Sequence, residues 1–224
     1  YRASLMMYLL YWLVSPIIFL SVWTTIARQN GTVNGLAVND FVTYYLVLLI
    51  VDQLTSNILI HTFPYKILDG SLSGELTKPI HPLLTASFTY NVAWKNLAFI
   101  VLMPVWIVLV LIFRPDFSAV TFSSVLLALP GLWLGFSTQF LFAAAICSLG
   151  FWTQRVYSIS DLFFYLMMLF SGQFAPLTVM PPLIQKISQV LPFRMFLYVP
   201  IETILNRMPP EVVWREYAIG LAWL

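Results

Sequence analysis

Apolar runs long enough to cross a lipid bilayer recur along this chain of 224 residues and constrain its fold more than any other feature. A spanning helix needs about 20 mostly apolar residues, and lipid-exposed loops or open sheet edges do not occur in hydrocarbon. Four runs approach or exceed that length, a fifth is shorter unless it starts upstream, and a last one begins near Trp214. The first five cover roughly residues 3–26, 41–60, 92–113, 120–149 and 159–170. The pattern predicts an all-α integral membrane protein with six transmembrane helices.

Composition agrees with a surface that faces lipid. Hydrophobic residues make up 60% of the chain and charged residues 9%, whereas soluble domains carry about 25% charged residues. The net charge is +2 and no basic cluster is present, so we expect no nucleic-acid partner. The single cysteine, Cys147, excludes an internal disulfide and a cysteine-based metal site. The first apolar run lacks a small-residue cleavage site, which favours a transmembrane helix over a signal peptide.

A polar stretch, KILDGSLSGELTKPIHP, separates the second and third runs at residues 66–82. It is too polar to span and too short to fold alone. Gly70 and Gly74 permit tight turns, and Leu72 and Leu76 lie one helical turn apart, so both could enter one groove of a partner protein. A solvated loop is the alternative interpretation.

A second irregular stretch follows the fifth run at residues 171–210 and is called the proline-rich segment below. It holds seven prolines and is apolar, yet no part of it forms a clean span. Proline removes a backbone donor and clashes with the preceding turn, so we expect two short helices that dip into one leaflet and return. A loop lying on the membrane surface is the alternative. The residues expected to shape this re-entrant element are Gly172, Pro176, Pro181, Pro182, Pro192 and Pro200.

Catalytic and nucleotide-binding motifs are missing from the sequence. There is no G-x-x-x-x-G-K-[ST] loop, so this chain alone is not expected to bind and hydrolyse ATP. Neither histidine, His61 or His81, has a carboxylate or cysteine at a metal-ligand spacing. No Ser-His-Asp arrangement or H-E-x-x-H motif is present. We therefore predict no catalytic residue, no metal and no cofactor bound by this chain.

Two acids and two glycines stand out within the apolar runs. Asp52 and Asp161 are intramembrane polar candidates, because an acid in hydrocarbon is costly and marks function by default. Asp52 has polar neighbours and could instead lie near the water interface, and Asp161 near a helix start could simply interact with the helix dipole. Gly131 and Gly135 form a G-x-x-x-G pattern that predicts close helix packing against an unspecified neighbour.

The order of these features resembles the ABC-2 type permeases, specifically the bacterial branch that pairs with a daunorubicin-resistance-like ATPase. The resemblance covers nearly the whole chain and is most specific at ILDGSLSGELTKPIHPL (67–83) and at SGQFAPLTVMPPLIQKISQVLPFRMFLYVPIETIL (171–205). It implies a single transmembrane domain over residues 1–224, with an outer re-entrant helical hairpin between helices five and six. It also implies a cytoplasmic coupling helix in the polar stretch 66–82, which is called the coupling segment below. The family's amphipathic segment before the first helix and the end of the last helix are expected to be missing from this sequence.

The resemblance also implies function and partners. The chain would be the permease subunit of an ATP-driven exporter in a bacterial cytoplasmic (inner) membrane, moving a hydrophobic, amphipathic or lipid-linked cargo by alternating access. Two ATPase subunits carrying ATP and Mg²⁺, a second permease (identical or related) and the lipid bilayer would be its partners. The residues expected to couple it to the ATPase are Lys66, Asp69, Gly70, Ser71, Leu72, Gly74, Glu75, Leu76, Lys78 and Pro79.

Orientation and two rival functions depend on the same resemblance. With a cytoplasmic amino end, five Lys and Arg residues would lie inside and six outside, so the positive-inside rule does not decide. Family members place both termini in the cytoplasm. An ABC importer permease is a rival, but its E-A-A…G cytoplasmic motif is absent. An integral membrane lipid-modifying enzyme is the other, and it would need a catalytic cluster.

Overall fold

Helices make up the regular structure of this protein. The computed structural model describes residues 2–85 and 91–224, with side chains for residues 14–85, 91–93 and 95–224. Within these residues every named element is helical, and an isolated bridge joins Val33 and Leu36. The long helices are α1 (Arg2–Asn30), α2 (Val38–Thr55), α6 (Ala93–Phe113), α7 (Phe122–Ser148), α8 (Val156–Phe170) and α11 (Pro210–Ala222). The all-α prediction is confirmed for the described part of the chain.

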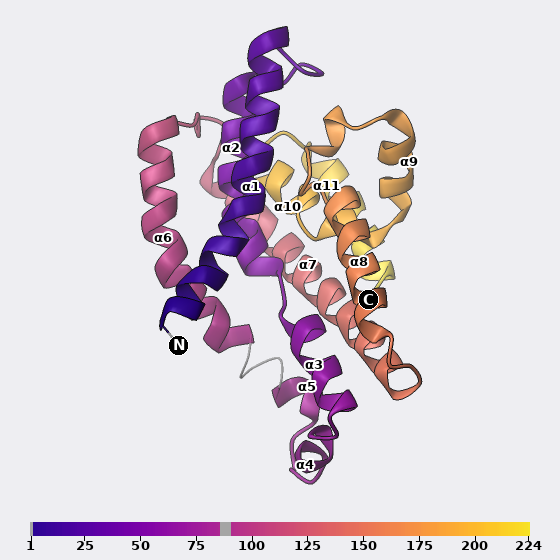
Figure 1. Ribbon diagram of the computed structural model, residues 1–224. Helices are drawn as coiled ribbons and strands as arrows, with labels where there is room; N and C mark the ends of the chain where they lie inside the picture. The colour runs from indigo at the N-terminus through magenta and orange to yellow at the C-terminus, as the bar shows by residue number, and fades with distance from the viewer. Residues whose placement is uncertain (1, 86–90) are drawn as a thin grey trace.

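Successive long helices run in opposite directions between two ends of the molecule, as Figure 1 shows. The proline-rich segment lies at one end, and the coupling segment projects from the other. In the part of the chain that the structure describes, three stretches are long and apolar enough to cross a membrane: Val38–Leu68, Lys95–Phe113 and Phe122–Phe151. The apolar helix α8 is shorter than these. The chain is therefore an integral membrane protein, while the count of six spans stays a prediction.

The second predicted span is interrupted near its end. α2 stops at Thr55, Ser56 is extended (φ −60°, ψ 154°), and α3 (Leu59–Leu68) then continues to the edge of the coupling segment. Asn57 Oδ1 accepts from Leu59 N at 3.2 Å, and Asn91 Oδ1 accepts from Ile58 N at 2.7 Å. These amides replace the carbonyls that a continuous helix would have offered, so the break is stabilised by side chains.

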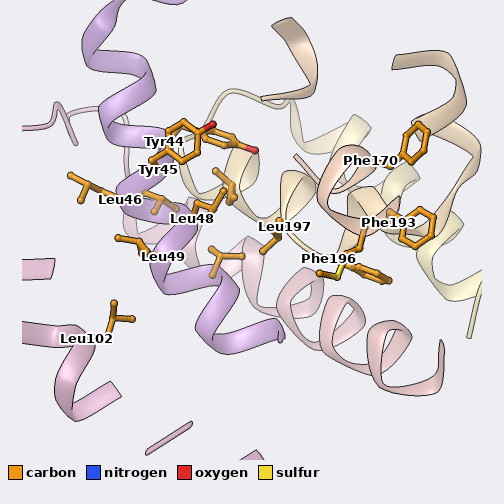
Figure 2. Packing of buried hydrophobic residues seen from close by; sticks show 14 of the residues in the cluster. Tyr44, Tyr45, Leu46, Leu48, Leu49, Leu102, Phe170, Phe193, Phe196 and Leu197 are labelled. Carbon is orange, nitrogen blue, oxygen red and sulfur yellow. The ribbon is translucent and has the colours of Figure 1, made fainter. Parts of the chain in front are cut away.

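Helix α2 forms the centre of the core. Its residues 41–49 are all buried, so apolar side chains are covered on every face, as expected for a helix surrounded by protein. Tyr44 and Leu48 belong to the same cluster of buried side chains as Phe196 and Leu197 of the proline-rich segment (Figure 2). By contrast, α6 exposes many apolar side chains, among them Ile100 and Leu111, each 69% exposed. In a membrane protein such a face contacts lipid.

The proline-rich segment is built from short pieces. It contains α9 (Pro182–Val190), α10 (Tyr198–Ile204) and two 3₁₀ turns, Leu177–Val179 and Pro192–Met195. The two short α-helices predicted from the prolines are present. Whether they dip into the bilayer as a re-entrant hairpin stays a prediction.

Two boundaries differ from the sequence-based expectation. α8 begins at Val156, so Asp161 lies in its second turn and is exposed. Because the helix dipole acts mainly on the first turn, the interpretation of Asp161 as a dipole-stabilising charge was wrong. α11 begins at Pro210, four residues before the expected start. A proline suits the first helical position, where its missing N–H would have no partner.

Candidate functional site

The coupling segment starts on helix α3 and turns sharply after it. Gly70 has a φ of +78°, which residues with a side chain rarely adopt. Ser71 N donates to Asp69 Oδ1 at 2.9 Å, and hydrogen bonds from Ser71 lower the pKa of Asp69 below its usual value. Ser73 Oγ donates to Gly70 O at 2.7 Å. These local bonds hold the turn that leads into the short helix α4 (Leu72–Leu76).

The two leucines of α4 do not act as a pair. Leu72 is 5% exposed and belongs to the main hydrophobic core, whereas Leu76 is 64% exposed. The expectation that both enter one partner groove was therefore wrong, because the side chain of Leu72 is already buried in this chain's own core. Lys66 and Glu75 form an ion pair that ties α4 back to α3. Gly74, Lys78 and Pro79 are exposed.

The coupling segment then leads to α5 (Pro82–Thr85), which contacts α4. Ile80 and Leu84 are 57% and 53% exposed, close to the value of Leu76. In Figure 1, α4 lies farthest out at its end of the molecule. The segment thus presents apolar side chains on a polar, well-defined turn, an arrangement suited to contact with another protein.

The proline-rich segment is anchored by side chains from distant helices. Gly172 has a φ of +89°, and its carbonyl accepts from Tyr44 Oη at 2.9 Å. The carbonyl of Phe174 accepts from both Tyr45 Oη (2.7 Å) and Trp23 Nε1 (2.9 Å). Aromatic donors from α1 and α2 therefore satisfy backbone carbonyls that no helix satisfies, as a buried irregular backbone requires.

The prolines of this segment occupy positions where a missing N–H costs little. Pro182 starts α9, Pro192 starts a 3₁₀ turn, and Pro200 lies in the first turn of α10. Pro176 precedes the other 3₁₀ turn and is buried, while Pro181 is the exposed residue before α9. The prolines thus divide the segment into short helices, as expected.

The glycine pair of α7 packs against this same chain. A Cβ on Gly135 would lie 2.7 Å from the backbone oxygen of Met195, and one on Gly131 would lie 2.7 Å from Tyr217 Oη. Met195 belongs to the proline-rich segment and Tyr217 to α11. The glycine pattern therefore allows α7 to pack closely against the last part of the chain. The sequence had left this packing partner undetermined.

Asp52 lines a cavity inside the helical bundle. The cavity, of about 40 Å³, lies at the break between α2 and α3 and is also lined by α7, α8 and the proline-rich segment. Its lining residues are Asp52, Ser56, Asn57, Ile60, His61, Gln139, Ala143, Phe163, Phe164, Met167 and Gln173. Asp161 is not among them, although it interacts electrostatically with His61. The structure therefore separates the two acids that the sequence had grouped.

Sequence reasoning missed the two glutamines of this cavity. Gln139 lies in the middle of an apolar helix and Gln173 directly after Gly172, and each is 7% exposed. A polar amide inside a spanning run was a signal that could have identified Gln139. The position of Gln173 depends on the fold of the proline-rich segment. Among the described residues no group of three His, Cys, Asp or Glu side chains could hold a metal ion.

Comparison with known proteins identifies the family. No curated protein and no solved structure shows significant similarity to the chain. The family model described as "ABC-2 family transporter protein" matches residues 9–223, which is nearly the whole chain. This protein therefore belongs to the ABC-2 transporter family, as the resemblance in the sequence predicted.

Proposed function

We propose that this chain is the permease subunit of an ATP-driven exporter and that its coupling segment docks on a separate ATPase. The observation that carries the proposal is the exposed apolar side chain of Leu76 on a turn held by Gly70, Asp69 and the Lys66–Glu75 ion pair. Membership of the ABC-2 family supports a transport role. An ATPase partner would supply ATP and Mg²⁺, since this chain has no phosphate-binding loop.

The proposed assembly has two permeases and two ATPases in a bacterial cytoplasmic membrane, with both permease termini in the cytoplasm. The coupling segment would lie on the cytoplasmic side, and the proline-rich segment would form a re-entrant hairpin on the outer side. Nucleotide-driven closure of the ATPases would move the two coupling segments and switch the permeases between inward- and outward-facing states. This requires contacts with the ATPase that differ between the two states.

Charge placed on the coupling segment tests the docking. Leu76→Asp should leave folding intact, because Leu76 is 64% exposed, and should abolish capture of the cognate ATPase, because a carboxylate is costly in an apolar contact. Leu183→Asp is the matched control: Leu183, on α9 at the opposite end, is 69% exposed. Normal ATPase capture by Leu76→Asp would refute docking at this residue.

Labelling of single cysteines tests the orientation. The native Cys147 is buried, which keeps the background low. A cysteine at Ser73 should react only from the cytoplasmic side, and one at Lys186 only from outside, because both positions are exposed. Reaction of the Ser73 cysteine from outside intact cells would reverse the proposed topology.

Purification of the native complex addresses the cargo and direction. Mass spectrometry of co-purified molecules should find an amphipathic or lipid-linked compound, and inside-out vesicles with ATP should take it up. Turnover of a lipid by the permease alone would instead favour a membrane enzyme, and uptake by right-side-out vesicles would favour an importer.

A further inference from the structure

Two residues that line the cavity at the α2–α3 break carry buried hydrogen-bond acceptors without donors. Gln139 Oε1 and Gln173 Oε1 are buried and have no hydrogen-bond partner. Gln139 Nε2 donates to Met167 Sδ at 3.1 Å, and this orientation of the amide leaves its oxygen without a donor. A buried acceptor without a partner costs free energy, so each of these oxygens favours an occupant that donates hydrogen bonds.

The carboxylate of Asp52 adds a charged acceptor to the same cavity. Within the described residues no side chain pairs with it. Lys95 interacts with it electrostatically, but the Lys95 ammonium donates to Leu54 O at 2.8 Å and lies 4.4 Å from the centre of the Phe136 ring. An acid at membrane depth normally faces a partner or a pathway. A cation in the cavity would supply the missing partner.

The apolar part of the lining selects among cations. Phe163, Phe164 and Met167 line the cavity beside the polar groups. Aromatic rings attract ammonium groups. The lining offers a single carboxylate, and among the described residues no group of three His, Cys, Asp or Glu side chains could hold a metal ion. The Asp52 carboxylate and the two glutamine oxygens without donors make three acceptors, which match the three N–H donors of a primary ammonium.

We propose that this cavity binds a primary ammonium group and, on the basis of the transport function proposed above, that this group belongs to the transported molecule. The ammonium donates to Asp52, Gln139 and Gln173 while its alkyl part contacts the phenylalanines. A lipid headgroup and a water-soluble amine share this chemistry.

A binding measurement on the permease alone tests the site. The probe is n-butylammonium, added to purified permease in phosphatidylcholine nanodiscs without ATPase, and the readout is the thermal unfolding midpoint as a function of probe concentration. A ligand that binds only the folded state raises the midpoint in a saturable way. We expect this with n-butylammonium and not with n-butanol or butyrate, which have similar chains without the ammonium.

Variants locate the binding. Asp52→Asn should weaken the apparent affinity about tenfold, equivalent to about 1.4 kcal/mol. Gln139→Met, which keeps the length but removes the acceptor, should weaken it severalfold and covers the case in which Asp52→Asn folds poorly. Asp161→Asn is the matched control and should bind normally, because Asp161 does not line the cavity.

Two results would overturn the proposal: binding that is unchanged in both Asp52→Asn and Gln139→Met, or equal stabilisation by butyrate or butanol. The same titration in nanodiscs that contain phosphatidylethanolamine separates the two sources of the ammonium group. Competition between this lipid and the probe assigns the site to a lipid ammonium, and absence of competition assigns it to a soluble amine. The ATPase capture described above is independent, so loss of either result leaves the other standing.

Discussion

The proline-rich segment and the coupling segment are both irregular stretches between long helices, yet they are held in opposite ways. Distant side chains anchor the first, through hydrogen bonds from Trp23, Tyr44 and Tyr45 to its backbone. The second is held mainly by bonds among its own residues and by one buried leucine. The comparison shows that backbone irregularity inside the bundle requires long-range partners, whereas irregularity in water needs only a local turn.

The largest expected effect comes from Gly172→Ala. The residue has a left-handed φ of +89°, and a Cβ there would lie 2.6 Å from Tyr44 Oη. Backbone strain of about 1–3 kcal/mol and overpacking of similar size should add, giving a loss of about 3 kcal/mol or more. Fluorescence-detected gel filtration after heating would show little folded protein. A wild-type melting temperature would mean that the anchor at Tyr44 moves freely.

Gly135→Ala should have the next largest effect, a loss of about 1–3 kcal/mol, because its Cβ meets a backbone oxygen of Met195 that cannot rotate away. Gly131→Ala is the graded comparison. The added Cβ of this variant meets the hydroxyl of Tyr217, which is the end of a side chain that can shift. The shift would break the 2.8 Å hydrogen bond from Tyr217 Oη to Leu127 O and cost about 1 kcal/mol. Thermal unfolding of both variants should give this order, and the reverse order would contradict it.

The glycines of the coupling segment test the other side of the comparison. Gly70→Ala should cost about 1–2 kcal/mol through its left-handed φ of +78°, with no steric clash. Gly74→Ala, in open space and without a positive φ, should leave stability unchanged or slightly raised. The melting temperatures of the two variants separate the effect of backbone strain at Gly70 from the effect of adding a methyl group. Equal losses would show that the coupling segment tolerates no side chain at either position.

The smallest expected loss of stability is that of Asp40→Asn. Asp40 Oδ1 accepts from Arg207 Nη2 at 2.6 Å and links α2 to the proline-rich segment, but both side chains are partly exposed (37% and 24%). Half-exposed ion pairs contribute up to about 1 kcal/mol, so the melting temperature should fall slightly and less so in high salt. A loss as large as that of Gly172→Ala would show that this ion pair, and not the aromatic anchors, holds the segment.

Several elements could be predicted because the signal is local. The apolar runs located α1, α6 and α7 to within a few residues, since hydrocarbon length sets helix length. Prolines predicted that residues 171–210 form short helices, since a missing donor acts on its own turn. The break at Ser56 was not predicted, because Asn91, which caps Ile58 N, lies 33 residues further along the chain.

The membrane class, the helical content and the family are thus determined by the sequence itself, because hydrophobic length and proline geometry act over a few neighbouring residues. Tertiary structure alone decided which leucine of α4 is buried, what Gly131 and Gly135 pack against, and that Asp52 shares a cavity with Gln139 and Gln173 while Asp161 does not. These outcomes depend on contacts between residues far apart in the chain, and no local periodicity encodes which helix faces which.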